Sequence, residues 1–235
     1  LTLLGVIMYL RLPWIIGQAG LWATLGIILV AHLVTICTGL SVASIATDKR
    51  IETGGTYYII SRSLGLPIGG TLGWSQFTGL SLAVSLYLIG FAQVLLGLLG
   101  IEVTIDNIRI MGSIALFAVL IITFISASLT IKTQFIMLGI LVLSLLSIFL
   151  GNHNLQPEVP QLAAIPESLP WIALFAIFFP AVTGFESGVS MSGDLRDARK
   201  DIPKGIMWAI LLAMLIYIAL TFFLSYTVDR EQLVN

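Results

Sequence analysis

Residues 178–188 read FFPAVTGFESG and lie in the middle of a long apolar segment. Pro180 removes a backbone hydrogen-bond donor, and Gly184 and Gly188 lower the helix propensity, so a continuous helix is poorly supported here. A merely kinked helix with small residues for close packing is one interpretation. The other is an unwound stretch, in which freed carbonyls bind cations and a half-helix N-terminus binds anions. Glu186 favours the unwound stretch, because close packing does not explain a carboxylate at this position.

The composition is that of a membrane protein. Of the 235 residues, 58% are hydrophobic and 10% are charged, whereas soluble domains carry about 25% charged residues. The apolar runs are of the length that a bilayer-spanning helix needs, which is roughly 20 residues. They do not alternate with polar residues as barrel strands do, so every span is predicted to be α-helical. The net charge of −1 gives no indication of a nucleic-acid partner.

Seven apolar segments define the predicted membrane spans. Their bounds are 1–16, 21–46, 68–99, 110–128, 134–150, 170–192 and 206–228. The third segment is longer than a span requires, which predicts a strong tilt or an end that projects from the bilayer. Because Leu1 already lies in an apolar run, we expect the sequence to be part of a longer protein.

The connections between these spans differ in charge. The basic residues of the second, fourth and sixth connections are Lys49, Arg50, Arg62, Lys132, Arg196, Arg199, Lys200 and Lys204. The other connections and the tail carry only Arg109 and Arg230. Because cytoplasmic loops are enriched in Lys and Arg, we expect the N-terminus to be cytoplasmic and residues 151–169 to lie outside.

The first span carries a weaker sign of a break. Thr2 and Gly5 precede a short apolar run, and one glycine in a membrane helix is ordinary. This segment, however, lies five spans before the segment that holds residues 178–188. Two helices at that odd spacing are antiparallel, as a pseudo-twofold axis in the membrane plane requires. The pattern therefore predicts an inverted-repeat transporter in which both helices are broken near the membrane centre.

Eight stretches of the sequence together resemble one protein family. They are residues 5–14 (GVIMYLRLPW), 17–20 (GQAG), 38–47 (TGLSVASIAT), 54–65 (GGTYYIISRSLG), 87–92 (YLIGFA), 178–188 (FFPAVTGFESG), 191–195 (MSGDL) and 202–205 (IPKG). In order and spacing they are similar to the cation–chloride cotransporter family. The resemblance implies the amino acid–polyamine–organocation permease superfamily and an all-α, leucine-transporter-like fold of two five-helix inverted repeats. Residues 1–150 would form the first repeat, and residues 170–228 the first two helices of the second.

The resemblance also implies where ions bind. The cation ligands, mostly backbone oxygens, would be Thr2, Leu3, Tyr87, Pro180 and Thr183. The family usually has Asn in place of Thr2, but the ligand at that position is mainly the backbone. One chloride would bind the amides of Gly5, Val6 and Ile7, and a second chloride those of Gly184, Phe185 and Glu186.

Two positions depart from the family pattern. Glu186 stands where an apolar residue is usual, and an ionised carboxylate would repel a chloride bound beside it. The order Gly-Phe-Glu is closer to amino-acid permeases of the same superfamily. Gln93 stands where the family typically has an acid that faces the helix 1 arginine, here Arg11, in an extracellular gate. Our hypothesis is that Glu186 either pairs with Arg11 or is a protonatable group that couples transport to protons.

The leading functional hypothesis is a multi-pass transporter of a cell membrane that couples chloride to potassium, with or without sodium, by alternating access. The alternative is a Na⁺- or H⁺-coupled amino-acid or polyamine permease of the same fold. A channel would need a repeated pore motif or a charged ring, and an enzyme would need clustered His, Asp or Cys. We expect neither an enzyme nor a cofactor beyond the transported ions. Any homodimer would form through C-terminal regions beyond this sequence.

Overall fold

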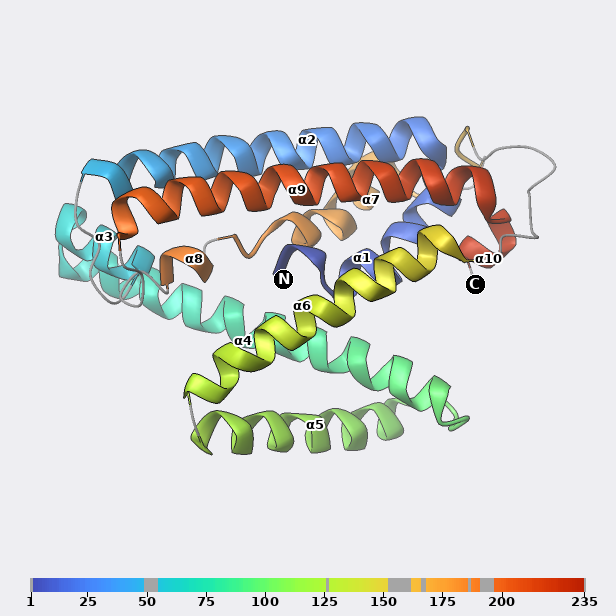
Figure 1. Ribbon diagram of the computed structural model, residues 1–235, viewed down its shortest axis with the longest axis horizontal. Coiled ribbons are helices and arrows are strands. Elements are labelled where there is room, and N and C mark those ends of the chain that lie inside the picture. Colours follow the sequence, from blue (N-terminus) through green and yellow to red (C-terminus); the bar gives the residue numbers. More distant parts are fainter. Residues whose placement is uncertain are drawn as a thin grey trace. The chain divides into compact units, whose positions relative to one another are not determined.

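The computed structural model describes residues 2–48, 55–125, 127–151, 162–165, 168–185, 187–190 and 197–234. The elements in chain order are the 3₁₀ helix η1 (Thr2–Leu4), α1 (Val6–Leu10), α2 (Leu12–Asp48), α3 (Gly55–Leu64), α4 (Leu66–Leu98), α5 (Ile105–Ile125), α6 (Ala127–Leu150), α7 (Trp171–Phe178), the 3₁₀ helix η2 (Phe179–Val182), α8 (Ser187–Ser190), α9 (Ala198–Thr227) and α10 (Arg230–Val234). Figure 1 shows these helices in colours that follow the sequence. The prediction of an all-α fold is confirmed, because every regular element in the described ranges is a helix.

Within the described ranges, six stretches are long and apolar enough to span a membrane, against the seven segments that we predicted. They are Leu12–Thr47, Leu66–Leu98, Ile105–Phe124, Thr133–Leu150, Trp171–Val189 and Arg199–Thr227. The difference lies in the first stretch, which joins the end of the first predicted segment to the second. Gly20 within it has φ 72° and ψ 177°, which is not helical. Figure 1 shows the dark blue residues before this kink and the lighter blue residues after it running in opposite directions.

The chain forms two compact units, one of which comprises residues 71–148. It contains most of α4, together with α5 and α6. The 33 residues of α4 extend about 50 Å at 1.5 Å per residue, which exceeds the roughly 30 Å hydrocarbon core. Helix α5 begins five residues before the predicted apolar segment. The prediction began later because the first turn of the helix is polar and was not counted in the apolar run. The backbone amide of Asn107 donates to Thr104 Oγ1 at 3.3 Å, and Asp106 suits the positive end of the helix dipole.

The second unit comprises residues 2–70 and 149–235, and its core lies between α2 and α9. These two helices run side by side. Ile27 and Ile28 of α2 and Ile210 of α9 are buried. A β-carbon at Gly39 would lie 2.9 Å from Ile210 Cδ1 and 3.2 Å from Ile206 Cγ2. The absence of a side chain at Gly39 therefore allows the two helices to approach closely.

A short stretch of the loop before α7 packs against the kink in α2. The Ile165 amide donates to the Gln18 carbonyl oxygen at 3.1 Å, and the Arg230 side chain donates to the Ala163 carbonyl oxygen at 2.6 Å. The backbone of Ala163 lies so close to Gly20 that a β-carbon at Gly20 would be 2.6 Å from it. Both the positive φ of Gly20 and this close approach explain why the chain turns at a glycine.

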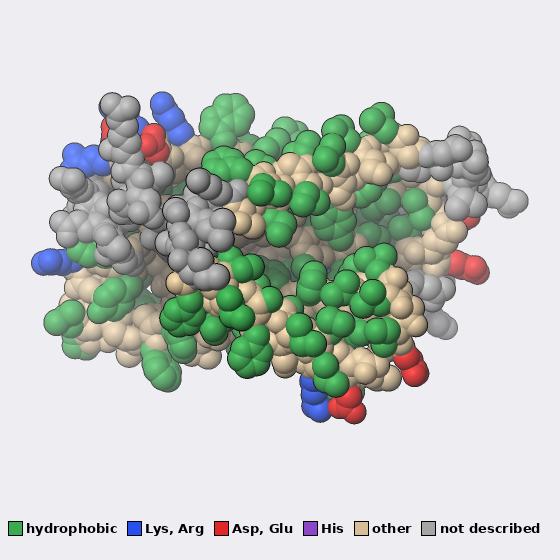
Figure 2. All heavy atoms as spheres, turned by 60° about the horizontal axis from the view of Figure 1, so that its bottom comes forward, with side chains coloured by type: hydrophobic (Ala, Val, Ile, Leu, Met, Phe, Trp, Pro, Cys, Tyr) green, Lys and Arg blue, Asp and Glu red, His purple; other side chains and the backbone are tan. Residues whose placement is uncertain are grey.

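Apolar side chains remain exposed on most of the helices. Figure 2 shows hydrophobic side chains gathered over the visible face of the molecule. On α5 and α6, for example, Phe117 is 65% exposed and Phe135 is 72% exposed. Soluble monomers rarely expose extensive apolar surface, whereas exposed apolar side chains on helices of membrane-spanning length suit contact with lipid or with other membrane helices. The chain is therefore an integral membrane protein.

Candidate ion-binding site

The first helix is broken at Gly5. The 3₁₀ helix η1 ends at Leu4, and α1 begins at Val6. Between them Gly5 is extended, with φ −103° and ψ −155°. The Met8 amide then donates to the Gly5 carbonyl oxygen at 3.0 Å. The prediction that helix 1 is discontinuous is thereby confirmed, and the backbone of η1 lies outside the α-helical ladder.

The sixth helix is broken within the FFPAVTGFESG stretch. Helix α7 tightens into η2, in which Pro180 occupies one of the first two positions. Thr183 is extended, with φ −88° and ψ 171°, and Gly184 has φ +97°. The Thr183 hydroxyl donates to the Pro180 carbonyl oxygen at 2.8 Å. This side chain therefore provides a hydrogen-bond donor for a carbonyl at the end of the broken helix. The unwound stretch is confirmed, and a merely kinked helix is excluded.

The two breaks lie side by side. Thr2 Oγ1 donates to the Gly184 carbonyl oxygen at 3.0 Å, and Ser187 Oγ donates to the same oxygen at 2.8 Å. A β-carbon at Gly184 would lie 3.0 Å from Thr2 Cβ and 3.2 Å from Thr2 Oγ1. The positive φ and the contact with Thr2 thus both require glycine at position 184.

A tyrosine of α9 completes the junction between the two breaks. Tyr217 is fully buried, and its hydroxyl lies 2.7 Å from the Leu3 carbonyl oxygen and 3.3 Å from the Ala181 carbonyl oxygen. Its ring packs edge-on against Phe178, with centroids 5.3 Å apart and an interplanar angle of 79°. Tyr217 is not among the site residues predicted from the sequence. A hydroxyl in the middle of an apolar span, which needs a hydrogen-bond partner when buried, was the available signal.

The structure brings together most of the predicted residues of helices 1 and 6. The η1 segment, which includes Thr2 and Leu3, contacts the η2 segment that contains Pro180, and Thr183 follows η2 directly. The predicted chloride ligands of these helices occupy the start of α1 and the residues after Thr183; they are Gly5, Val6, Ile7, Gly184 and Phe185. These residues therefore surround one junction.

For four other predicted positions, the structure does not test the predicted role. Tyr87 and Gln93 belong to α4 in the unit of residues 71–148, and their roles remain predictions. Glu186 lies outside the described residues. Arg11 is exposed between α1 and α2, and its amide donates to the Ile7 carbonyl oxygen at 2.9 Å. The proposed pairing of Arg11 with Glu186 likewise remains a hypothesis.

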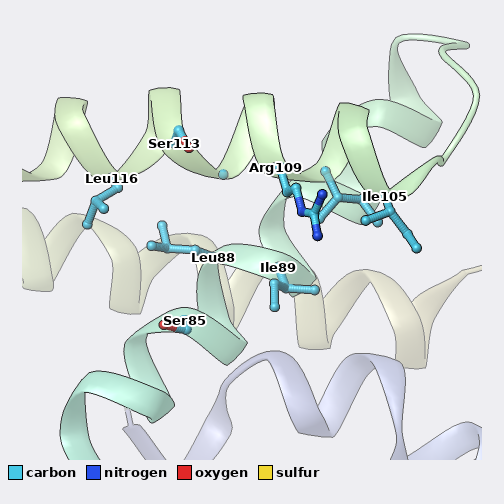
Figure 3. Close-up of a pocket in the computed structure, with 9 residues that line it drawn as sticks. Ser85, Leu88, Ile89, Ile105, Arg109, Ser113 and Leu116 are labelled. Carbon is cyan, nitrogen blue, oxygen red and sulfur yellow. The ribbon is translucent and has the colours of Figure 1, made fainter. Parts of the chain in front are cut away.

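A separate pocket lies between α4 and α5, with a volume of about 420 Å³. Its lining residues are Ser85, Leu88, Ile89, Ile105, Ile108, Arg109, Gly112, Ser113 and Leu116. Figure 3 shows Arg109 and Ile105 towards one end of the pocket and Leu116 towards the other. Arg109 forms an exposed ion pair with Asp106 at 3.5 Å. This lining contains none of the predicted ion ligands, so the pocket is distinct from the junction of the two breaks.

The comparisons with known proteins agree with this architecture. A model of the amino acid permease family matches residues 1–235. Human solute carrier family 12 member 2 is 34% identical over 261 residues, which cover 100% of this chain and 21% of the relative. Mouse solute carrier family 12 member 1 is 35% identical over 98% of this chain and 23% of its own length. For mouse member 3 the identity is 34%, over 98% of this chain and 25% of the relative.

The chain therefore spans between a fifth and a quarter of the length of these relatives. Its match to the family extends over both broken helices and over the helices that support them. The chain belongs to the amino acid permease family, and the predicted resemblance to the cation–chloride cotransporters within it is confirmed by its solute carrier family 12 relatives.

Proposed function

We propose that the protein containing this chain is a secondary active transporter that carries chloride together with potassium, with or without sodium, by alternating access. The observation that carries the proposal is the pair of facing breaks, joined by the 3.0 Å hydrogen bond from Thr2 to Gly184. Inverted-repeat transporters place their substrate and coupling-ion sites at discontinuous helices of this kind. The resemblance to cation–chloride cotransporters supports the choice of ions.

The cation would bind among the oxygen atoms of Thr2, Leu3, Pro180 and Thr183, with Tyr87 as a further ligand. The Thr183 hydroxyl donates to the Pro180 carbonyl oxygen. A hydroxyl that donates its only proton to a carbonyl keeps its lone pairs for another partner. Neutral carbonyl and hydroxyl oxygens of this kind can replace the hydration shell of an alkali cation.

One chloride would bind the amides of Gly5, Val6 and Ile7 at the start of α1. The first amides of a helix have no partner within the helix and carry the positive end of its dipole. A second chloride would bind beside Gly184 and Phe185. Because an ionised Glu186 would repel it, we propose that chloride binds there when Glu186 is protonated, which would couple chloride transport to pH.

The topology follows from the charge of the connections. The N-terminus and the basic connections would be cytoplasmic, in the plasma membrane of a eukaryote or the inner membrane of a bacterium. Residues 1–150 would form the first inverted repeat, and residues 170–228 the start of the second. The pseudo-twofold axis would then relate the two broken helices, and rocking of these helices against the rest would provide alternating access.

Uptake of radioactive rubidium, a potassium substitute, tests the proposal in cells that express the complete reading frame encoding this chain. We expect uptake that requires external chloride, and Thr183→Val should raise the rubidium KM roughly 10-fold, since an oxygen ligand is lost. Thr123→Val is the matched control, because Thr123 is an exposed residue of α5 outside the site. Chloride-independent uptake of an amino acid, with no rubidium uptake, would instead establish the permease alternative.

A further inference from the structure

We propose that Tyr217 is a positioning residue that sets the geometry of the cation site from outside the two broken helices. The inference rests on the proposed cation–chloride transport, because it assigns a role to the Leu3 carbonyl as a cation ligand. Tyr217 lies on α9, the helix that follows the second break, and it was not among the predicted site residues. Its role would be to hold a ligand, not to bind the ion.

The hydroxyl of Tyr217 reaches both breaks at once. It lies 2.7 Å from the Leu3 carbonyl oxygen and 3.3 Å from the Ala181 carbonyl oxygen. A phenol has one proton to donate, and the shorter distance indicates that it is donated to Leu3. The Leu3 carbonyl is thereby fixed in direction, while its second lone pair remains for a cation.

The ring of Tyr217 is held from two sides. Phe178 packs against it edge-on, and the His32 ring of α2 lies with its centroid 5.8 Å away at an interplanar angle of 59°. His32 is itself buried, and its Nδ1 donates to the Ile28 carbonyl oxygen at 2.9 Å. Both aromatic neighbours thus restrict the movement of the phenol. The hydroxyl is presented by α9, which packs along α2.

In this arrangement the proposed ion ligand, the Leu3 carbonyl, and the group that orients it, the Tyr217 hydroxyl, belong to different helices. The η1 segment is three residues long, so it makes few hydrogen bonds of its own that could orient the Leu3 carbonyl. Thr2 attaches this segment to Gly184 through a side chain, and Tyr217 attaches it to α9. Without the Tyr217 hydroxyl, the Leu3 carbonyl would be free to turn away, and the cation site would lose a preorganised ligand.

Tyr217→Phe tests the role of the hydroxyl, since it keeps the ring between Phe178 and His32. We expect the rubidium KM at saturating chloride to rise roughly 2- to 10-fold, the effect of one hydrogen bond. The chloride KM at saturating rubidium should change less than about twofold, because the hydroxyl bonds to the carbonyl oxygens of Leu3 and Ala181, whereas the proposed chloride ligands are backbone amides. Tyr226→Phe is the matched control, as Tyr226 is 49% exposed on the same helix.

Rescue distinguishes positioning from packing. Incorporation of 4-aminophenylalanine at position 217 restores a donor and should restore the rubidium KM, whereas 4-fluorophenylalanine, which has no donor, should not. This pair also replaces Tyr217→Phe if that variant fails to reach the membrane. An unchanged rubidium KM, a fall in maximal rate alone, or equal behaviour of the two analogues would overturn the inference. Absence of chloride-dependent rubidium uptake by the wild-type protein would instead overturn the proposed function, and the cation-site role with it.

Discussion

Replacing Gly184 by alanine perturbs the point at which the two broken helices meet. Gly184 has φ +97°, a conformation that costs a residue with a side chain on the order of 1–3 kcal/mol. The new β-carbon would lie 3.0 Å from Thr2 Cβ and 3.2 Å from Thr2 Oγ1, so Thr2 must move away. Loss of its hydrogen bond to the Gly184 carbonyl costs about another 0.5–1.5 kcal/mol. We therefore expect Gly184→Ala to destabilise the junction by about 2–4 kcal/mol.

Two measurements on the purified and the expressed protein report this loss. The apparent unfolding temperature in detergent, recorded at one scan rate, should fall by several degrees, and chloride-dependent rubidium uptake should fall at least about tenfold. Gly188→Ala is the matched control four residues away. A β-carbon at Gly188 meets nothing within 4 Å, and no positive φ is recorded for it, so this variant should match the wild type. Equal unfolding temperatures and uptake for Gly184→Ala and Gly188→Ala would refute the reasoning.

Two further predictions concern the support of the site and its coupling. Gly39→Leu inserts a side chain where Ile206 and Ile210 approach α2; overpacking of this kind costs about 1–3 kcal/mol and should lower the unfolding temperature. The control Gly205→Ala, where a β-carbon meets nothing within 4 Å, should leave the unfolding temperature unchanged. An unchanged unfolding temperature for Gly39→Leu would contradict the packing of α2 on α9. Glu186→Gln should abolish the pH dependence of chloride-dependent uptake, which in the wild type should fall as pH rises and the carboxyl ionises. If the Gln variant kept both the wild-type uptake rate and the wild-type pH profile, both proposed roles of Glu186 would be contradicted.

The break in helix 6 was predictable because its causes are local. Pro180 cannot donate a hydrogen bond in any tertiary context, and a glycine is the residue that adopts a positive φ at no steric cost. The structure uses Gly184 in this way, with φ +97°. The turn between the first two spans was predictable for a similar reason, since Gly20 has φ +72°. Breaks and turns that depend on the backbone of a single proline or glycine can therefore be predicted from the sequence.

The role of Tyr217 was not predictable, because it depends on which helices pack together. Its hydroxyl reaches Leu3, which is 214 residues away in the sequence. Its place in the middle of an apolar span separates Tyr217 from Tyr226, which is exposed near the end of the same helix, but that position does not indicate which carbonyl the hydroxyl bonds. The pairing appears only when α9 packs beside the two broken helices.

Helix α3 was missed for a different reason. Residues 55–64 lie in a connection that was identified only by its lack of a long apolar run. They form a short amphipathic helix, in which the Arg62 guanidinium lies 5.5 Å from the centroid of the Tyr58 ring. A search for spans by hydropathy passes over such helices, since their polar side lowers the average.

The position of a bound cation can be measured by anomalous X-ray scattering from rubidium in crystals of the full-length protein with chloride. A peak bounded by the Leu3 and Pro180 carbonyl oxygens and the Thr183 hydroxyl is expected, and it should weaken in Thr183→Val crystals grown under the same conditions. A rubidium peak elsewhere in the membrane region, with none at the junction of the two breaks, would contradict the assignment of the ion site.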